Sequence, residues 1–191
     1  MKSSTSVSIS GYGGYVPKLR LPTSEVAKLW KGGGSGPNKA KSVASIDEDT
    51  TTMSVEAARD AILMAGDCNI GAVFVGTESK PYAVKPTSTI VAQALGINRT
   101  LAADFEFACK AGTEAMQVIT GLIGSSMIDS GLALGVDTAQ GRPGDSLEYT
   151  AGSAAAAFVL SKRSENLYLG IKTYFRDTLF FLGQKIKFLN F

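Results

Sequence analysis

Residues 71–76, Gly-Ala-Val-Phe-Val-Gly, form an unbroken apolar run bounded by glycines. A strand without alternating polar residues is typical of a parallel sheet that is covered on both faces. Further along the chain, the hydrophobic pattern predicts a helix over 86–95, a strand over 101–105, a helix over 110–127 and a strand over 131–136. This βαβαβ alternation predicts an α/β fold with right-handed crossovers, in which ligand chemistry gathers at the carboxyl ends of the strands.

The pattern extends on both sides of this unit. Residues 6–10 alternate polar and apolar side chains and meet the glycines of 11–14, which predicts a short strand that runs into a turn. Residues 54–66 predict a helix that ends at its glycine, and 154–160 predict a last apolar strand. A chain of 191 residues is long enough for one such domain.

Composition excludes several classes of function. A formal net charge of +2 gives little electrostatic attraction to nucleic acid or to an acidic membrane. No run approaches the roughly 18 apolar residues of a membrane span, and the first ten residues lack the apolar core of a signal peptide, so we expect a cytoplasmic protein. With two cysteines and no histidine, we expect no metal site, and the chain alone cannot supply a Cys-His or Ser-His-Asp pair.

Cys109 lies between the strand predicted at 101–105 and the helix predicted to begin at Lys110. A thiol at a helix N-terminus faces unpaired N–H groups and the positive end of the helix dipole, which stabilise the nucleophilic thiolate. A small buried hydrophobic residue is an equally good interpretation from the spacing alone. Cys68, in a turn between a helix and a strand, has no comparable setting.

Two carboxylates follow strands whose carboxyl ends should lie at the same edge as Cys109. Glu78 comes directly after the strand at 71–76, so it is either a general base beside the thiol or a solvated loop acid, and position alone favours the loop acid. Asp137 follows the strand at 131–136. We expect it to have a structural role, in which it orients a neighbour or caps the next turn.

Four blocks of sequence carry a family resemblance. They are 45–50 (Ser-Ile-Asp-Glu-Asp-Thr), 75–88 (Val-Gly-Thr-Glu-Ser-Lys-Pro-Tyr-Ala-Val-Lys-Pro-Thr-Ser), 105–113 (Phe-Glu-Phe-Ala-Cys-Lys-Ala-Gly-Thr) and 135–145 (Gly-Val-Asp-Thr-Ala-Gln-Gly-Arg-Pro-Gly-Asp). In this order, within a match that runs from about residue 8 to 160, they resemble archaeal-type hydroxymethylglutaryl-CoA synthase, a member of the thiolase superfamily.

The resemblance implies a thiolase-like fold, of which this chain supplies one βαβαβαββ half, the N-terminal one, of an αβαβα sandwich. It assigns residues 1–165 to this half. Residues 166–191 are then a divergent aromatic and basic tail, so we expect a truncated or frame-shifted chain.

The same resemblance implies an acyltransferase of the mevalonate pathway of isoprenoid biosynthesis, which condenses acetyl-CoA with acetoacetyl-CoA. Cys109 would carry the acetyl group as a thioester and Glu78 would be the general base or acid, with CoA thioesters as substrates and no cofactor. The family takes a histidine from its second half to polarise the ketone, and this chain has none. The implied partners are a second copy in a homodimer, an acetoacetyl-CoA thiolase and a small scaffold protein.

Two other functions remain open. One is another condensing enzyme of the superfamily, a ketoacyl synthase III or a thiolase, which shares the cysteine at the helix start but not the block around Glu78. The other is a non-catalytic thiolase-like subunit that binds CoA esters or serves in assembly. The absence of histidine supports this second alternative.

Overall fold

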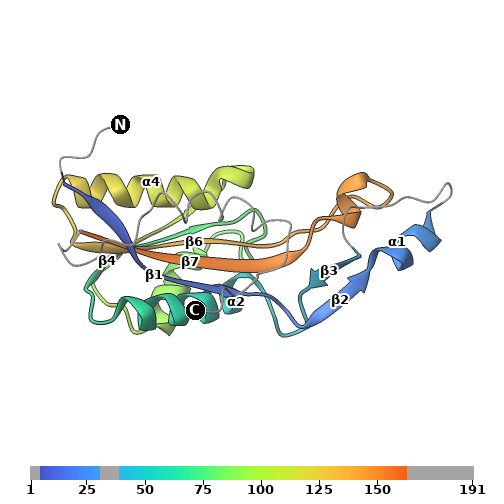
Figure 1. The fold of residues 1–191 in the computed structure, drawn as a ribbon, viewed down its shortest axis with the longest axis horizontal. Coiled ribbons are helices and arrows are strands. Elements are labelled where there is room, and N and C mark those ends of the chain that lie inside the picture. Colours follow the sequence, from blue (N-terminus) through green and yellow to red (C-terminus); the bar gives the residue numbers. More distant parts are fainter. Residues whose placement is uncertain (1–4, 31–38, 163–191) are drawn as a thin grey trace, which may run out of the picture.

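The computed structural model describes residues 5–30 and 39–162, which form a layered α/β structure around a five-stranded sheet (Figure 1). The sheet has the strand order β1-β7-β6-β4-β5. β4, β5 and β6 are parallel, as predicted, whereas β1 and β7 run antiparallel to their neighbours. The strand bounds are β1 (Val7–Tyr15), β4 (Ile70–Gly76), β5 (Leu101–Phe105), β6 (Ser130–Thr138) and β7 (Ser153–Lys162). The expected tail at 166–191 lies outside the described residues.

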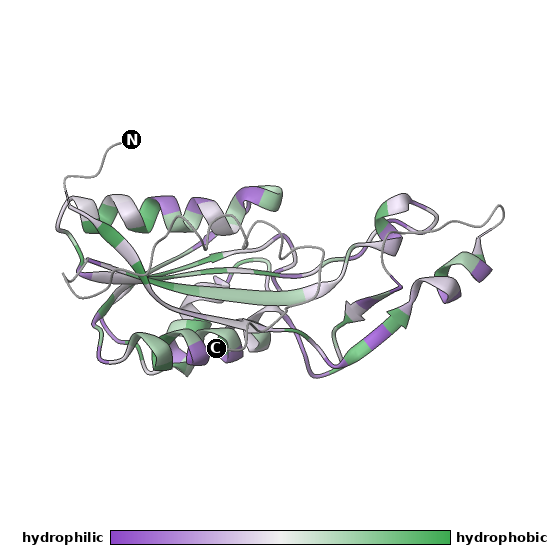
Figure 2. Cartoon of the chain, in the orientation of Figure 1, coloured by the Kyte–Doolittle hydropathy of each residue, from purple (hydrophilic) through white to green (hydrophobic). Residues whose placement is uncertain are grey.

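Helices cover both faces of the sheet (Figure 1). α4 (Ala111–Gly124) packs on one face, where Ile119 and Ile123 join Phe74 in a buried cluster. α2 (Thr50–Ala65) and α3 (Thr87–Ala94) pack on the other face around Met53 and Val91. Figure 2 shows the apolar strands of the sheet between these helices. Within the described ranges, no helix combines the length and the hydrophobicity that crossing a bilayer requires.

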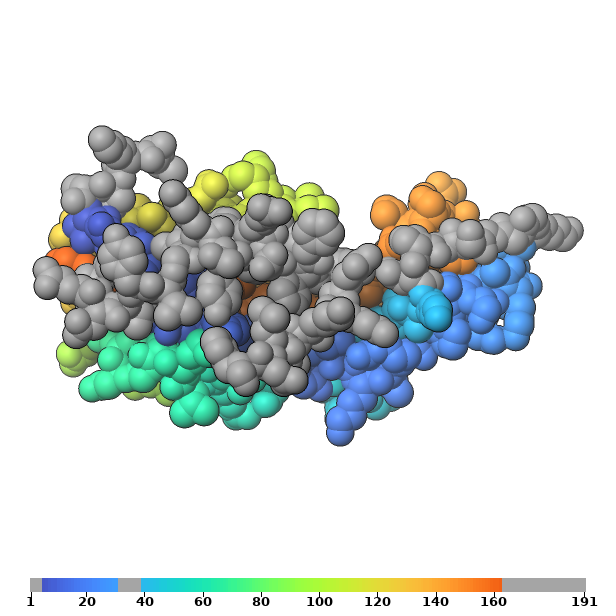
Figure 3. All heavy atoms as spheres, viewed as in Figure 1, coloured from blue at the N-terminus to red at the C-terminus, as the bar shows by residue number. Residues whose placement is uncertain are grey.

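The order of elements around the sheet is β1-α2-β4-α3-β5-α4-β6-β7. This is the βαβαβαββ half that the sequence predicts. A segment between β1 and α2 interrupts it: β2 (Leu19–Pro22), α1 (Thr23–Leu29) and β3 (Ala40–Val43). Together with the short helix η2 (Ser146–Tyr149), these elements form an arm that extends beyond the end of the sheet (Figures 1 and 3).

The predicted turn at 11–14 is wrong, because these glycines lie within β1. A Cβ on Gly11 would fall 2.0 Å from the carbonyl oxygen of Ala61, and one on Gly13 would fall 2.2 Å from that of Ala57. The backbone of β1 therefore lies directly on α2, an approach that any side chain would prevent. The glycines serve packing rather than chain reversal.

The start of α2 also differs from the prediction, since the helix begins at Thr50 and not at Ser54. Asp49 caps it: its carboxylate accepts from the Thr52 backbone N–H at 2.7 Å, and the Thr52 hydroxyl accepts from the Asp49 N–H at 2.8 Å. This reciprocal pair is a capping box with threonine in the position usually taken by glutamate or glutamine. The acidic turn before the helix is thus its N-terminal cap.

Candidate active site

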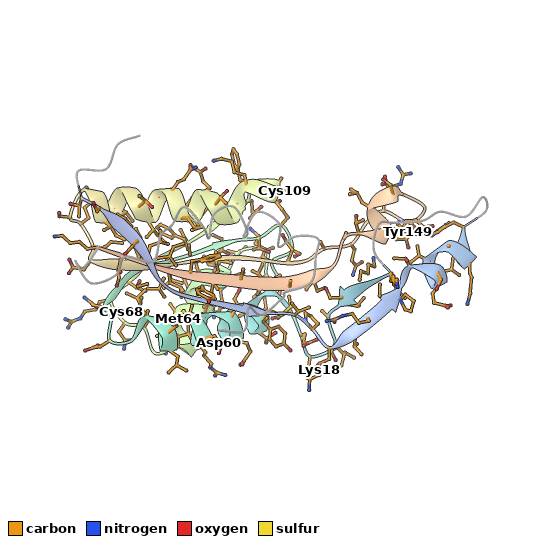
Figure 4. All side chains as sticks on the ribbon, viewed as in Figure 1. Lys18, Asp60, Met64, Cys68, Cys109 and Tyr149 are labelled. Carbon is orange, nitrogen blue, oxygen red and sulfur yellow. The ribbon has the colours of Figure 1, made fainter. Side chains whose placement is uncertain are left out.

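The three parallel strands end at one edge of the sheet, where Gly76 of β4 lies in register with Phe105 of β5 and with Gly135 of β6. Glu78 follows β4, Cys109 follows β5, and Asp137 lies near the end of β6. As the sequence predicts, these segments come together at the same edge. Figure 4 shows Cys109 at the start of α4, at the end of the sheet that faces the arm.

Asp137 connects the turn after β4 with β6 through hydrogen bonds. Its Oδ1 accepts hydrogen bonds from the Glu78 backbone N–H at 2.9 Å, from the Ser79 hydroxyl at 2.7 Å and from the Thr77 hydroxyl at 3.2 Å. The Ser79 hydroxyl in turn accepts from the Thr138 backbone N–H at 2.9 Å. This arrangement agrees with the structural role expected for Asp137.

Glu78 connects the turn after β4 with the Cys109 turn, which we define as residues 106–110. One oxygen of its carboxylate accepts from the backbone N–H of Ala108 at 2.5 Å. Ala108 has a φ of +46°, in the left-handed region that residues with a side chain rarely adopt. The Glu78 side chain therefore holds a strained backbone unit next to Cys109.

Cys109 lies in a single 3₁₀ turn, η1 (Ala108–Lys110), which leads directly into α4. The predicted position at the start of a helix is therefore correct to within one turn. The residue is exposed, so the alternative interpretation as a small buried hydrophobic residue is wrong. Glu78 is exposed as well, and the thiol and the carboxylate are both open to solvent.

Cys68 lies near the end of the molecule opposite Cys109 (Figure 4). It is partly buried, and this burial is the main cause that raises the pKa of its thiol, with the negative charge of Asp67 as the second cause. Both effects disfavour the thiolate. The structure thus separates the two cysteines in position and in environment.

Sequence reasoning missed two features of the Cys109 turn. The first is the left-handed Ala108, for which the residue type gives no signal. The second is an ion pair between Lys80 and Glu106. A signal for it exists, because these opposite charges follow neighbouring parallel strands. Within residues 5–30 and 39–162, no three His, Cys, Asp or Glu residues gather in a way that could hold a metal ion.

Comparisons with known proteins identify relatives of the chain. It matches no family model. It is 49% identical over 184 residues to the hydroxymethylglutaryl-CoA synthase of Pyrococcus furiosus, which covers 93% of this chain and 52% of the relative. It is 54% identical over 161 residues to the enzyme of the same name from Methanocella arvoryzae, covering 81% of this chain and 46% of the relative.

Solved structures show the same fold. A hydroxymethylglutaryl-CoA synthase complexed with CoA superposes with a TM-score of 0.73 at 22% identity, over 82% of this chain and 42% of that one. The priming β-ketosynthase of the R1128 polyketide pathway gives a TM-score of 0.77 at 22% identity, over 85% of this chain and 52% of that one. At this level of identity, these structures indicate the thiolase-like fold and do not indicate the reaction. The chain is therefore a thiolase-like homologue of the archaeal hydroxymethylglutaryl-CoA synthases, and it spans about half the length of the curated relatives that it matches.

Proposed function

We propose that this chain carries the acylating part of a condensing enzyme that makes hydroxymethylglutaryl-CoA from acetyl-CoA and acetoacetyl-CoA. One observation carries the proposal: the Glu78 carboxylate accepts a hydrogen bond from the residue directly before Cys109. The proposed base is thus held at the turn that carries the proposed nucleophile, at the carboxyl edge of the sheet. This is the pair of groups that an acyl-enzyme condensation requires.

In the first step, the Cys109 thiolate attacks the carbonyl carbon of acetyl-CoA. The bond between this carbon and the CoA sulfur breaks, CoA leaves as a thiolate, and Cys109 keeps the acetyl group as a thioester. The negative charge that develops on the carbonyl oxygen needs hydrogen-bond donors, and the backbone N–H of Cys109 is the donor that this turn offers.

In the second step, Glu78 removes a proton from the acetyl methyl group. The electron pair left on this carbon forms a bond to the ketone carbon of acetoacetyl-CoA, and the resulting alkoxide takes up a proton. Water then attacks the acyl carbon, the bond to the Cys109 sulfur breaks, and hydroxymethylglutaryl-CoA leaves. Glu78 and Cys109 thus have separate tasks in the reaction. They also lie on separate segments, Glu78 after β4 and Cys109 in η1.

Glu78, which carries the proton taken from the methyl group, can return it to the alkoxide, but neither Cys109 nor Glu78 is the hydrogen-bond donor that polarises the ketone during the attack. Since the chain contains no histidine and spans about half the length of its relatives, we assign this donor to a part of the enzyme beyond these 191 residues. Acetylation of Cys109 uses only groups that this chain provides. The proposal therefore separates into an acetylation step, which this chain can be tested for directly, and a condensation step.

The proposal includes the assembly and setting that the family resemblance implies: a homodimer, contacts with an acetoacetyl-CoA thiolase and a small scaffold protein, and a cytoplasmic location in the mevalonate pathway.

The homodimer has structural support. Within the described part of the chain, β5 pairs only with β4, so its outer edge is open, and Leu101 on this strand is 55% exposed. Open strand edges are normally covered, and a second copy of β5 would cover this one.

The test is intact-mass measurement of the purified chain after brief incubation with acetyl-CoA. We expect an adduct with the mass of one acetyl group in the wild type and in Glu78→Gln, because the base is needed only after acetylation. Cys109→Ser should give no adduct, and Cys68→Ser, the matched control, should acetylate normally.

The outcomes separate the proposal from its alternative. No adduct on a folded wild-type chain would favour a non-catalytic subunit that binds CoA esters or serves in assembly. An adduct that persists in Cys109→Ser would assign acetylation to another residue and overturn the proposal.

A further inference from the structure

Ser79, in the turn after β4, is anchored through its hydroxyl, its N–H and its carbonyl. The hydroxyl donates to the Asp137 carboxylate at 2.7 Å and accepts from the Thr138 backbone N–H at 2.9 Å. The N–H donates to the Thr77 hydroxyl at 3.1 Å, and the carbonyl accepts from the Thr50 hydroxyl at 3.4 Å. A single residue of this turn is thus connected with β6 and with the first residue of α2.

Glu78, the residue before it, lies beyond the hydrogen-bond ladder of the sheet. The ladder of β4 ends with its last residue, and one further backbone bond joins the Thr77 N–H to the Phe105 carbonyl at 3.0 Å. The peptide group before Glu78 is held by Asp137, which accepts the Glu78 N–H at 2.9 Å. The peptide group after it is held through Ser79. Both peptide groups that flank the Glu78 side chain are therefore fixed.

The Ser79 hydroxyl has a task that few side chains can perform. One atom donates to a carboxylate and accepts from a backbone N–H at the same time, which a hydroxyl can do and a methyl group cannot. In Ser79→Ala, Asp137 would keep the Thr77 hydroxyl and the Glu78 N–H as donors. The turn would remain attached to β6, but the backbone on the C-terminal side of Glu78 would be held less firmly.

We propose that Ser79 is a positioning residue that directs the Glu78 carboxylate toward the Cys109 turn. This carboxylate is exposed and accepts from the Ala108 N–H at 2.5 Å, so its place depends on the backbone from which it extends. The inference rests on the proposed function, in which Glu78 must reach the methyl group of acetyl-Cys109. A displacement of about 1 Å strongly slows such a step. Acetylation itself does not use Glu78, so it should not depend on Ser79.

The amide proton of Ala108 reports the position of Glu78 without turnover, because an N–H in a charge-assisted bond to a carboxylate resonates downfield. Phe107-Ala108 is the only Phe-Ala pair in the sequence, so phenylalanine labelled with ¹³C at its carbonyl and alanine labelled with ¹⁵N select this one amide in the full chain. Glu78→Ala gives the resonance of the amide without its carboxylate. We expect Ser79→Ala to move the resonance upfield, toward this reference. Ser79→Thr keeps the hydroxyl and should stay near the wild-type value.

Ser10→Ala is the matched control. Ser10 is also half-buried, and its hydroxyl donates to the Val159 carbonyl at 3.3 Å, but it lies on β1, at the opposite edge of the sheet from β5. This variant should leave the Ala108 resonance unchanged. An unchanged resonance in Ser79→Ala, or the same shift in Ser10→Ala, would overturn the inference.

A second measurement compares acetylation of Cys109, by intact mass, with deuterium uptake into the methyl group of acetyl-Cys109 in heavy water. In Ser79→Ala we expect acetylation at the wild-type rate and uptake that is lower by about tenfold or more, whereas Ser79→Thr should retain both. Equal losses of acetylation and uptake would show that Ser79 supports the whole sheet edge rather than Glu78, and would overturn the inference. If the wild type is not acetylated, the proposed function fails, while the Ala108 resonance still decides whether Ser79 positions Glu78.

Discussion

Gly76, the last residue of β4, and Gly112, in the first turn of α4, lie in direct backbone contact. A Cβ on Gly76 would fall 2.4 Å from the amide nitrogen of Gly112, and one on Gly112 would fall 3.1 Å from the Cα of Gly135 in β6. The first turn of α4 therefore lies directly on the carboxyl ends of two strands. Since Cys109 lies in the 3₁₀ turn that leads into this helix, these glycines determine how close Cys109 comes to the sheet edge.

We expect Gly76→Ala to displace the start of α4 and to slow acetylation of Cys109. The added methyl group meets backbone atoms that cannot rotate away, so the overpacking should lower the free energy of unfolding by about 1–3 kcal/mol. Urea denaturation measures the stability, and intact mass after incubation with acetyl-CoA measures the acetylation.

Gly121→Ala is the matched control for this substitution. Gly121 lies in α4, and a Cβ at this position would meet nothing within 4 Å. The alanine should therefore stabilise the protein by about 0.5–1 kcal/mol, as in an ordinary helix interior. If Gly76→Ala behaved like Gly121→Ala, the close approach would have no role in positioning Cys109.

Asp137→Ala should destabilise the protein more than Asp137→Asn. The alanine removes the acceptor of three hydrogen bonds to residues 77–79, and each donor left buried and unpaired costs about 1–3 kcal/mol. Asparagine keeps an acceptor oxygen in the same place. Urea denaturation of both variants checks this order, and equal losses would show that the negative charge matters rather than the acceptor geometry.

The two thiols should react with iodoacetamide at different rates. Cys109 is exposed, whereas burial raises the pKa of the partly buried Cys68 and leaves it with less thiolate near pH 8. Labelling at pH 8 should therefore reach Cys109 first, and modification of Cys68 should increase as the pH rises toward its pKa. Mass spectrometry of Cys109→Ala and Cys68→Ala assigns each rate, and faster labelling of Cys68 would contradict the structure.

Much of the fold follows from hydrophobic pattern alone. The strand predicted at 101–105 coincides with β5, and the apolar run at 71–76 falls within β4. β4 is almost entirely buried, whereas β5 at the edge of the sheet is only partly buried. The placement of Cys109 and Glu78 at one edge then follows from parallel topology, without any contact being known.

The hydrophobic pattern does not predict close contacts between two backbone segments. It also does not predict a hydrogen bond from a side chain to a turn that is distant in the sequence. Gly11 and Gly13 predicted a turn because glycine gives the same local signal whether it reverses a chain or admits a helix. The contact between Glu78 and Ala108 spans two loops, so no local propensity encodes it. Residue type and position suggested Cys109 and Glu78 as the reactive groups, and the structure was needed to show how their segments are held.

The open edge of β5 provides a test of the proposed homodimer. Leu101→Arg places a charge on this exposed strand, and if a second copy of β5 pairs there, the buried charges should shift the chain from dimer to monomer. Leu63→Arg is the matched control, because Leu63 is 83% exposed on α2, away from β5. Sedimentation equilibrium measures the mass of each variant. A wild type that is monomeric at micromolar concentration, or a Leu101→Arg variant that remains dimeric, would exclude β5 as the dimer contact, whereas dissociation of Leu101→Arg alone would locate the contact at this strand.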